Sequence, residues 1–153
     1  MIYYLIKLPI LKRLIPSLIR KIYIFFGKED FKIKFKNLII EIEIRDPIDR
    51  EIYLSKKYEE RQFEEVFTMI KNNNIEIFLD VGANAGIYSL ILSKNFKNLI
   101  IESFEPVSLT FKKFFRNAKY NNLEKNINFY NYGLSDTNST LNMDTNVKFG
   151  YKQ

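Results

Sequence analysis

The stretch IEIFLDVGANAGIYSLILSK, from Ile75 to Lys94, is the most informative part of the sequence. It begins with β-branched, aromatic and other apolar residues up to Val81, a composition that is typical of a buried parallel strand. Small residues then fill Gly82 to Gly86, and apolar residues return at helical spacing from Ile87. A strand, a tight glycine turn and a helix place backbone N–H groups and a helix N-terminus at the carboxyl end of the strand. This order predicts a site for a small polar or anionic ligand.

The composition of the 153-residue chain limits its chemistry. A hydrophobic content of 46% and an aromatic content of 16% are enough for the packed core of one domain, or of part of a larger one. The chain has no cysteine, which excludes disulfides and thiolate nucleophiles and fits a cytoplasmic location. It has no histidine either, so the commonest general base and metal ligand are missing. We predict no metal site, and any ion would have to be held by Asp, Glu or Asn oxygens.

The formal net charge of +6 raises the question of an anionic partner. Over most of the chain the lysines are interspersed with carboxylates, so no basic stripe for RNA or DNA is evident. We therefore expect no nucleic-acid partner.

Residues 1–28 form a basic segment with no acidic residue before Glu29. Pro16 and Gly27 would bracket a short helix from Ser17 to Phe26. No apolar run approaches the ~20 residues of a transmembrane helix. One interpretation is a basic helix that touches the inner face of an anionic membrane through residues 1–27. The other is a helix that packs on the domain with its lysines in water, which we favour because the basic positions do not share one clean face.

Residues 29–74 lead into the central stretch. Alternating apolar and polar residues predict a β-hairpin from Phe31 to Phe35 and Leu38 to Ile44. Arg50 to Leu54 is read as a short third strand. Apolar residues at helical spacing predict an amphipathic helix from about Tyr58 to Lys71.

Residues 75–153 continue with alternating strands and helices. After the central stretch we predict a second buried strand from Asn98 to Phe104, a helix from Leu109 to Tyr120 and a third strand from Ile127 to Tyr132. Leu141 to Met143 would be a further short strand. The order β-α-β-α-β is that of one half of a doubly wound sheet, so the predicted fold class is α/β.

Two carboxylates stand beside the glycine turn. Asp80 precedes the turn, and Glu105 ends the second predicted strand, where a carboxylate can bind the two hydroxyls of a ribose. Gly82 and Gly86 fit positions where a side chain would meet a ligand or force an unfavourable φ. The alternative for each carboxylate is a helix cap or a solvated charge. The turn does not follow the G-x-G-x-x-G spacing of dinucleotide-binding proteins.

Short motifs around this region agree in order and spacing with a known family. They are DVGANAG from Asp80 to Gly86, FEP from Phe104 to Pro106, Asn117 with Asn121, and LSD from Leu134 to Asp136. In these motifs the chain resembles the FkbM family of S-adenosylmethionine-dependent methyltransferases, from about Lys32 to Met143. The upstream DPIDREIYLSKKYE is also similar to the family. Gly133 departs from the pattern, since alanine is usual there.

The resemblance implies a class I methyltransferase Rossmann-like fold that binds S-adenosylmethionine. The implied cofactor residues are Asp80, Gly82, Ala83, Asn84, Gly86, Glu105, Pro106, Ser135 and Asp136. In that family the turn would line the methionine end of the cofactor and Glu105 would hold the ribose hydroxyls. Pro106 with Val107 would border the adenine, and Ser135 and Asp136 would lie near its amino group.

The resemblance also implies O-methylation of a sugar or another hydroxyl acceptor in glycan or natural-product biosynthesis. A substrate oxygen would attack the sulfonium methyl group in line, and no residue in these motifs stands out as the base that accepts its proton. The alternative is a non-catalytic membrane-associated or assembly module that works through the basic N-terminus.

The family's domain continues with a further strand and an acidic motif, and nothing of that kind follows Met143. We therefore expect a fragment that is inactive alone. Without a neighbouring fourth strand, the strand from Ile75 to Val81 would be an exposed apolar edge, which favours pairing with another chain. We expect self-association through this edge.

Overall fold

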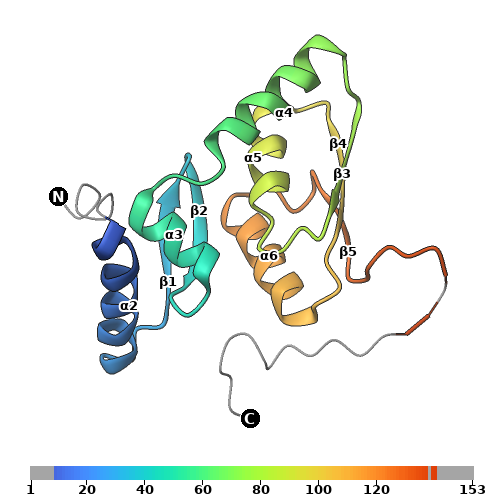
Figure 1. The fold of residues 1–153 in the computed structure, drawn as a ribbon. Coiled ribbons are helices and arrows are strands. Elements are labelled where there is room, and N and C mark those ends of the chain that lie inside the picture. The colour runs from blue at the N-terminus through green and yellow to red at the C-terminus, as the bar shows by residue number, and fades with distance from the viewer. Residues whose placement is uncertain (1–8, 138, 141–153) are drawn as a thin grey trace. The chain divides into compact units, whose positions relative to one another are not determined.

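The computed structural model describes residues 9–137, 139 and 140, which divide into two compact units (Figure 1). The first unit contains the residues up to Phe35 together with Ile40–Glu59. The second contains Lys36–Ile39 and the chain from Glu60 onward. The glycine turn and both of its carboxylates therefore lie in one unit, the second.

The first unit begins with a helix that is longer than predicted. Helix α2 runs from Pro9–Phe25 with Pro16 inside it, so the predicted start at Ser17 is wrong. A proline within a helix removes one hydrogen bond but does not always end the helix, and the apolar spacing continues across it from Leu14 to Leu18. The end is as predicted. Gly27 has a left-handed φ of 64°, and its N–H donates to the carbonyl of Ile24 at 3.0 Å.

The predicted hairpin is confirmed as strands β1 (Asp30–Phe35) and β2 (Leu38–Glu43). The two residues between the strands, Lys36 and Asn37, both have positive φ angles, of 45° and 63°. Such a pair gives the tight turn whose twist matches that of the two strands.

The predicted third strand from Arg50 to Leu54 is wrong, because this segment belongs to helix α3 (Pro47–Ser55). The side chain of Asp46 caps the helix by accepting from the N–H groups of Ile48 and Asp49, at 2.8 and 3.0 Å. Pro47 follows in the first turn, where its missing N–H costs nothing. The Asp-Pro pair therefore starts a helix, as well as following a strand.

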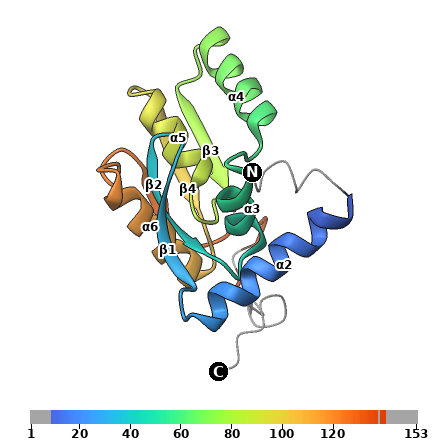
Figure 2. The same cartoon turned by 90° about the vertical axis from the view of Figure 1, so that its left-hand side faces the viewer.

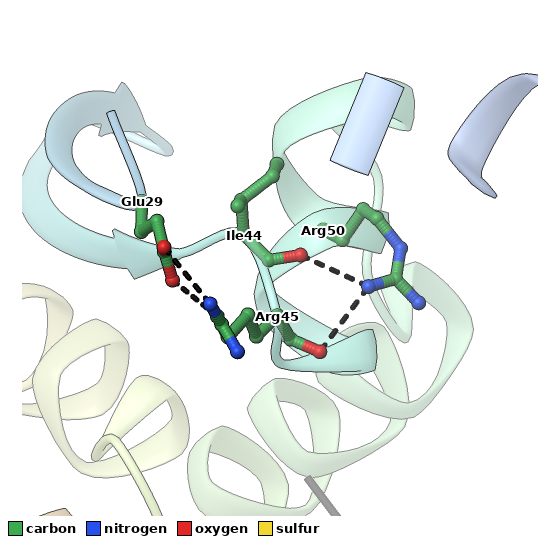
Figure 3. Close-up of polar contacts among 4 residues, drawn as sticks. All are labelled: Glu29, Ile44, Arg45 and Arg50. Carbon is green, nitrogen blue, oxygen red and sulfur yellow. Dashed lines mark hydrogen bonds and ion pairs between the residues drawn. The ribbon is translucent and has the colours of Figure 1, made fainter. Parts of the chain in front are cut away.

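Charged side chains join the two ends of the hairpin to each other and to helix α3 (Figure 3). The guanidinium of Arg45 forms a two-point ion pair with the carboxylate of Glu29. Arg50 of α3 donates through Nη1 to the carbonyl oxygens of Ile44 and Arg45, at 2.9 and 3.2 Å. Burial lowers the pKa of Arg50 from its usual value, and the charge of Arg20 lowers it further. The first unit is thus held by polar contacts as well as by its buried isoleucines.

The second unit has the predicted β-α-β-α-β order, preceded by a helix. Its elements are α4 (Glu60–Asn72), β3 (Ile77–Val81), α5 (Ile87–Asn95), β4 (Ile100–Phe104), α6 (Ser108–Tyr120) and β5 (Asn128–Tyr130). The strands are parallel and lie in the order β3-β4-β5. Helices α5 and α6 lie on the same side of this sheet (Figures 1 and 2). The strand predicted from Leu141 to Met143 falls outside the described residues.

The two faces of the sheet differ in burial. On the helix side Ile101 and Ser103 are buried, and Phe114 of α6 is fully buried as well. On the other side Ile77, Leu79 and Val81 remain between 54% and 59% exposed. The expectation of a fully buried β3 is therefore wrong. Within the part of the chain that the structure describes, β3 is an edge strand, as the topology argument predicted.

Candidate functional site

Three residues with left-handed backbone conformation build the turn between β3 and α5. Gly82, Asn84 and Gly86 have φ angles of 78°, 51° and 82°. Glycine adopts such angles freely, whereas other residues are strained there. A Cβ at Gly86 would lie 1.9 Å from the ring of Phe114, while a Cβ at Gly82 would meet no described atom within 4 Å. Gly86 is therefore needed for packing against α6, and Gly82 leaves open space beside the turn.

The backbone of the turn is fastened to the end of β4. The N–H groups of Gly82 and Ala83 both donate to the carbonyl oxygen of Phe104, at 2.9 and 3.0 Å. The N–H of Asn84 donates to Oε2 of Glu105 at 2.8 Å. These donors were expected to face a ligand, and the structure shows that the protein itself uses them. These N–H groups are therefore not free to bind a ligand, and what the turn provides for a ligand is the open space beside Gly82.

Glu105 lies at the centre of the site, with only 6% of its surface exposed. Its two carboxylate oxygens accept from the N–H groups of Asn84 and Val107, each at 2.8 Å. The side chain of Asn131 donates to its backbone carbonyl at 2.8 Å. A carboxylate can accept about four hydrogen bonds, so Glu105 has capacity for two hydroxyl groups while these bonds hold it in one orientation.

Asp80 lies on β3 itself, one residue before the strand ends, and contacts Ser89 in the first turn of helix α5. Its Oδ2 accepts from the hydroxyl of Ser89 at 2.5 Å, and that hydroxyl is 2.7 Å from the hydroxyl of the buried Ser103. Burial raises the pKa of the Asp80 carboxyl above its usual value. Hydrogen bonds from Ser89 oppose this rise, and the charge of Glu105 adds to it. A carboxylate at this position offsets the positive end of the α5 dipole.

Helix α6 contacts the glycine turn through Asn117, and Asn121 on the same helix contacts the residue Ile39. The side chain of Asn117, which is fully buried, donates to the carbonyl of Ala85 at 3.1 Å. Asn121, one helical turn later, uses its amide to bond both backbone groups of Ile39, at 2.8 and 2.7 Å. Sequence reasoning identified both asparagines without assigning them a role. It missed Ser89, whose signal is its place in the first turn of α5.

The residues expected around the adenine, Pro106, Ser135 and Asp136, contact the glycine turn less directly. Pro106 follows Glu105, and Gly133 lies against the Pro106 ring, because a Cβ there would be 3.6 Å from the Pro106 Cβ. Ser135 and Asp136 are exposed, and the hydroxyl of Ser135 donates to Asp136 at 3.2 Å. The structure therefore brings Asp80, the turn, Glu105 and Pro106 together, whereas the contacts of Ser135 and Asp136 are with their neighbours in sequence.

The fold of the chain is similar to that of solved structures, among them a methyltransferase and a candidate transferase. An S-adenosylmethionine-dependent methyltransferase from Agrobacterium tumefaciens is 10% identical, with a TM-score of 0.50 over 67% of this chain and 32% of that one. A candidate transferase from Pyrococcus horikoshii is 16% identical, with a TM-score of 0.50 over 82% of this chain and 50% of that one. The chain has a Rossmann-like class I methyltransferase fold. This confirms the predicted fold class.

The likeness covers only part of those proteins, since the chain spans about a third of the first structure and half of the second. No protein-family model matches the sequence, and no curated protein matches it.

Within this methyltransferase-like fold, the charge of the site limits what it can bind. Besides burial, the charge of Glu105 raises the pKa of the Asp80 carboxyl. Asp80 also occupies the N-terminus of α5, where a phosphate would otherwise bind. The site is therefore suited to a ligand that carries hydroxyl groups and positive charge, and not to the diphosphate of a dinucleotide. This narrows the ligand expected from sequence, which was polar or anionic.

Proposed function

We propose that the chain is the S-adenosylmethionine-binding part of a methyltransferase of the FkbM type. The observation that carries this proposal is the pair of carboxylates, Asp80 and Glu105, on either side of a glycine turn in a Rossmann-like sheet. S-adenosylmethionine carries a ribose diol, an ammonium group and a sulfonium. Its chemistry therefore suits an acidic site that has room for hydroxyl groups.

The turn and the two carboxylates beside it fit the cofactor in three respects. Glu105 has free acceptor capacity and is already fixed in orientation, so a ribose would meet a rigid acceptor. Asp80 carries the charge that an ammonium group or a sulfonium would neutralise. Gly82 leaves space that any side chain would fill. Pro106, Ser135 and Asp136 are the proposed residues around the adenine, by resemblance to the family.

When bound, S-adenosylmethionine supplies an electrophilic methyl group for transfer to a nucleophile. The residues of this chain would bind and orient the cofactor rather than take part in bond making. By resemblance to the family, we propose a sugar or other hydroxyl group as acceptor, in glycan or natural-product biosynthesis.

Calorimetric titration of the whole chain with S-adenosylhomocysteine tests this proposal. We expect binding, and we expect Gly82→Ala to weaken it about tenfold or more, because the new Cβ projects into the space proposed for the ligand. Gly27→Ala is the matched control. Gly27 also has a left-handed φ and no described atom near a new Cβ, but it lies in the first unit. Its substitution tests backbone strain alone.

Absence of binding by a chain that circular dichroism shows to be folded would overturn the proposal. It would favour the alternative of a non-catalytic module. Equal losses in Gly82→Ala and Gly27→Ala would show that the turn does not contact the ligand.

A further inference from the structure

Helix α2 exposes a continuous row of large apolar side chains, which we call the α2 stripe. It consists of Leu14, Leu18, Ile22 and Phe25, with Phe26 directly after the helix. The spacing of four, four and three residues places the four helical members on one face. All five side chains are between 44% and 83% exposed. Large apolar residues that share one exposed face usually mark a surface that binds something.

The opposite side of α2 is already occupied within the first unit. Tyr23 lies there, and its hydroxyl is 2.6 Å from the hydroxyl of Tyr53 of α3. Its ring lies 5.2 Å from the ring of Phe31 of β1, centroid to centroid. The helix therefore packs on its own unit through one side while the α2 stripe faces away from those contacts.

Positive charge borders the α2 stripe. Lys21 is exposed and lies one helical turn from both Leu18 and Phe25. Lys28, just after the helix, is exposed as well, and the sequence contains no acidic residue before Glu29. The carboxylate of Glu29 is itself paired with Arg45. The surroundings of the stripe are thus basic, with the nearest carboxylate in sequence already neutralised.

We propose that α2 docks the chain on an anionic lipid surface, with the α2 stripe in the acyl region and its basic residues at the headgroups. A row of apolar residues beside lysine and arginine is the arrangement of helices that lie in the plane of a membrane. No helix in the described part of the chain is long and apolar enough to cross a membrane. Helix α2 has 17 residues (Figure 2, blue). In this proposal it lies in the plane of the membrane surface and does not cross the membrane. The proposal goes beyond the methyltransferase function and does not depend on it.

The charge pattern favours lipid over a second copy of the chain. Two α2 stripes that faced each other would bring the basic residues of both copies together, and like charges at an interface oppose association. An anionic headgroup layer attracts those same residues.

Co-sedimentation of the whole chain with vesicles tests the proposal. One set of vesicles contains phosphatidylcholine alone, and the other contains phosphatidylglycerol as well. We expect binding to the anionic vesicles that salt weakens. Leu18→Glu, in the middle of the stripe, is expected to reduce binding about tenfold or more. A double substitution, Lys21→Gln with Lys28→Gln, is expected to reduce binding to anionic vesicles several-fold.

Met69→Glu is the matched control, because Met69 is exposed to the same degree as Leu18 but lies on α4 in the second unit. It should bind vesicles as the unchanged chain does. The proposal is overturned if the unchanged chain fails to bind anionic vesicles, or if Leu18→Glu and Met69→Glu bind equally well. It is also overturned if Leu18→Glu dissociates an oligomer that never binds lipid, since the stripe would then contact a second copy.

Discussion

The ring of Phe114 occupies the space in which a side chain at Gly86 would lie, with its Cδ2 atom 1.9 Å from the Cβ that any other residue would carry. This contact joins the glycine turn to α6 and makes the turn part of the core. We expect Gly86→Ala to lower the free energy of unfolding by about 2 to 5 kcal/mol, from overpacking together with a left-handed φ. Urea unfolding followed by circular dichroism measures this change.

A second substitution separates the effect of overpacking from that of the left-handed φ. Phe114→Leu removes ring atoms from the collision, so the double variant Gly86→Ala/Phe114→Leu should lose less stability than the sum of the single changes. Strict additivity would contradict a collision between the two residues.

Ser89 and Ser93 form a matched pair on α5, since both are buried and lie one helical turn apart. The Ser89 hydroxyl lies between Asp80 and Ser103, whereas the Ser93 hydroxyl has no hydrogen-bond partner among the described residues. Ser89→Ala should therefore cost about 1 to 3 kcal/mol, and Ser93→Ala should be neutral or stabilising. Denaturant unfolding of the two variants compares them directly. Equal effects would contradict the polar network.

The raised pKa of Asp80 gives the stability of the fold a pH dependence of known sign. Because folding raises the pKa of this carboxyl above 3.8, the folded state binds a proton more strongly than the unfolded chain. The stabilisation from this proton is present at low pH and is lost as pH rises through the folded-state pKa. Relative to the unchanged chain, Asp80→Asn should therefore become more stable as pH rises from about 4 to about 7. Urea unfolding at several pH values tests this, and a difference that falls with pH would contradict it.

The exposed face of β3 predicts self-association of the isolated chain. Ile77, Leu79 and Val81 project from an edge strand, which is the usual setting for pairing with another chain. Leu79→Lys should reduce association measured by sedimentation velocity, because a charged residue on an edge strand opposes pairing. Leu109→Lys is the control, since Leu109 is exposed on α6. A sharp monomer boundary for the unchanged chain would contradict the prediction.

Local sequence patterns were enough to predict most elements of the second unit. The glycine turn, the apolar strand before it and the helical spacing after it are all encoded within a few residues, so α5, β4 and α6 appear close to where they were expected. Of the wrong predictions in the first unit, the third strand arose because one sequence signal fits two structures. Asp46-Pro47 follows the end of strand β2, which also fits a loop before another strand, but the same pair caps and starts α3.

The contacts of the site could not be read from local pattern. Asn84 and Glu105 are joined by a hydrogen bond across 21 positions, which forms only because β3 and β4 pair in parallel. Asp80 was singled out as a carboxylate near a ligand, with a helix cap as the alternative. In the structure its carboxylate accepts from the hydroxyl of Ser89, because the turn folds the first turn of α5 back over the end of β3. Tertiary pairing determines both contacts.

The most direct test of the account is calorimetric titration with S-adenosylhomocysteine of the unchanged chain, Glu105→Gln and Glu102→Gln. Both residues lie on or directly after β4, but Glu102 bonds Asn128 and lies away from the turn. We predict that the unchanged chain and Glu102→Gln bind with similar affinity and that Glu105→Gln binds at least about tenfold more weakly, since an amide offers fewer acceptors and places a donor against an N–H. Equal affinities for the two variants, or no binding by the folded chain, would contradict the account.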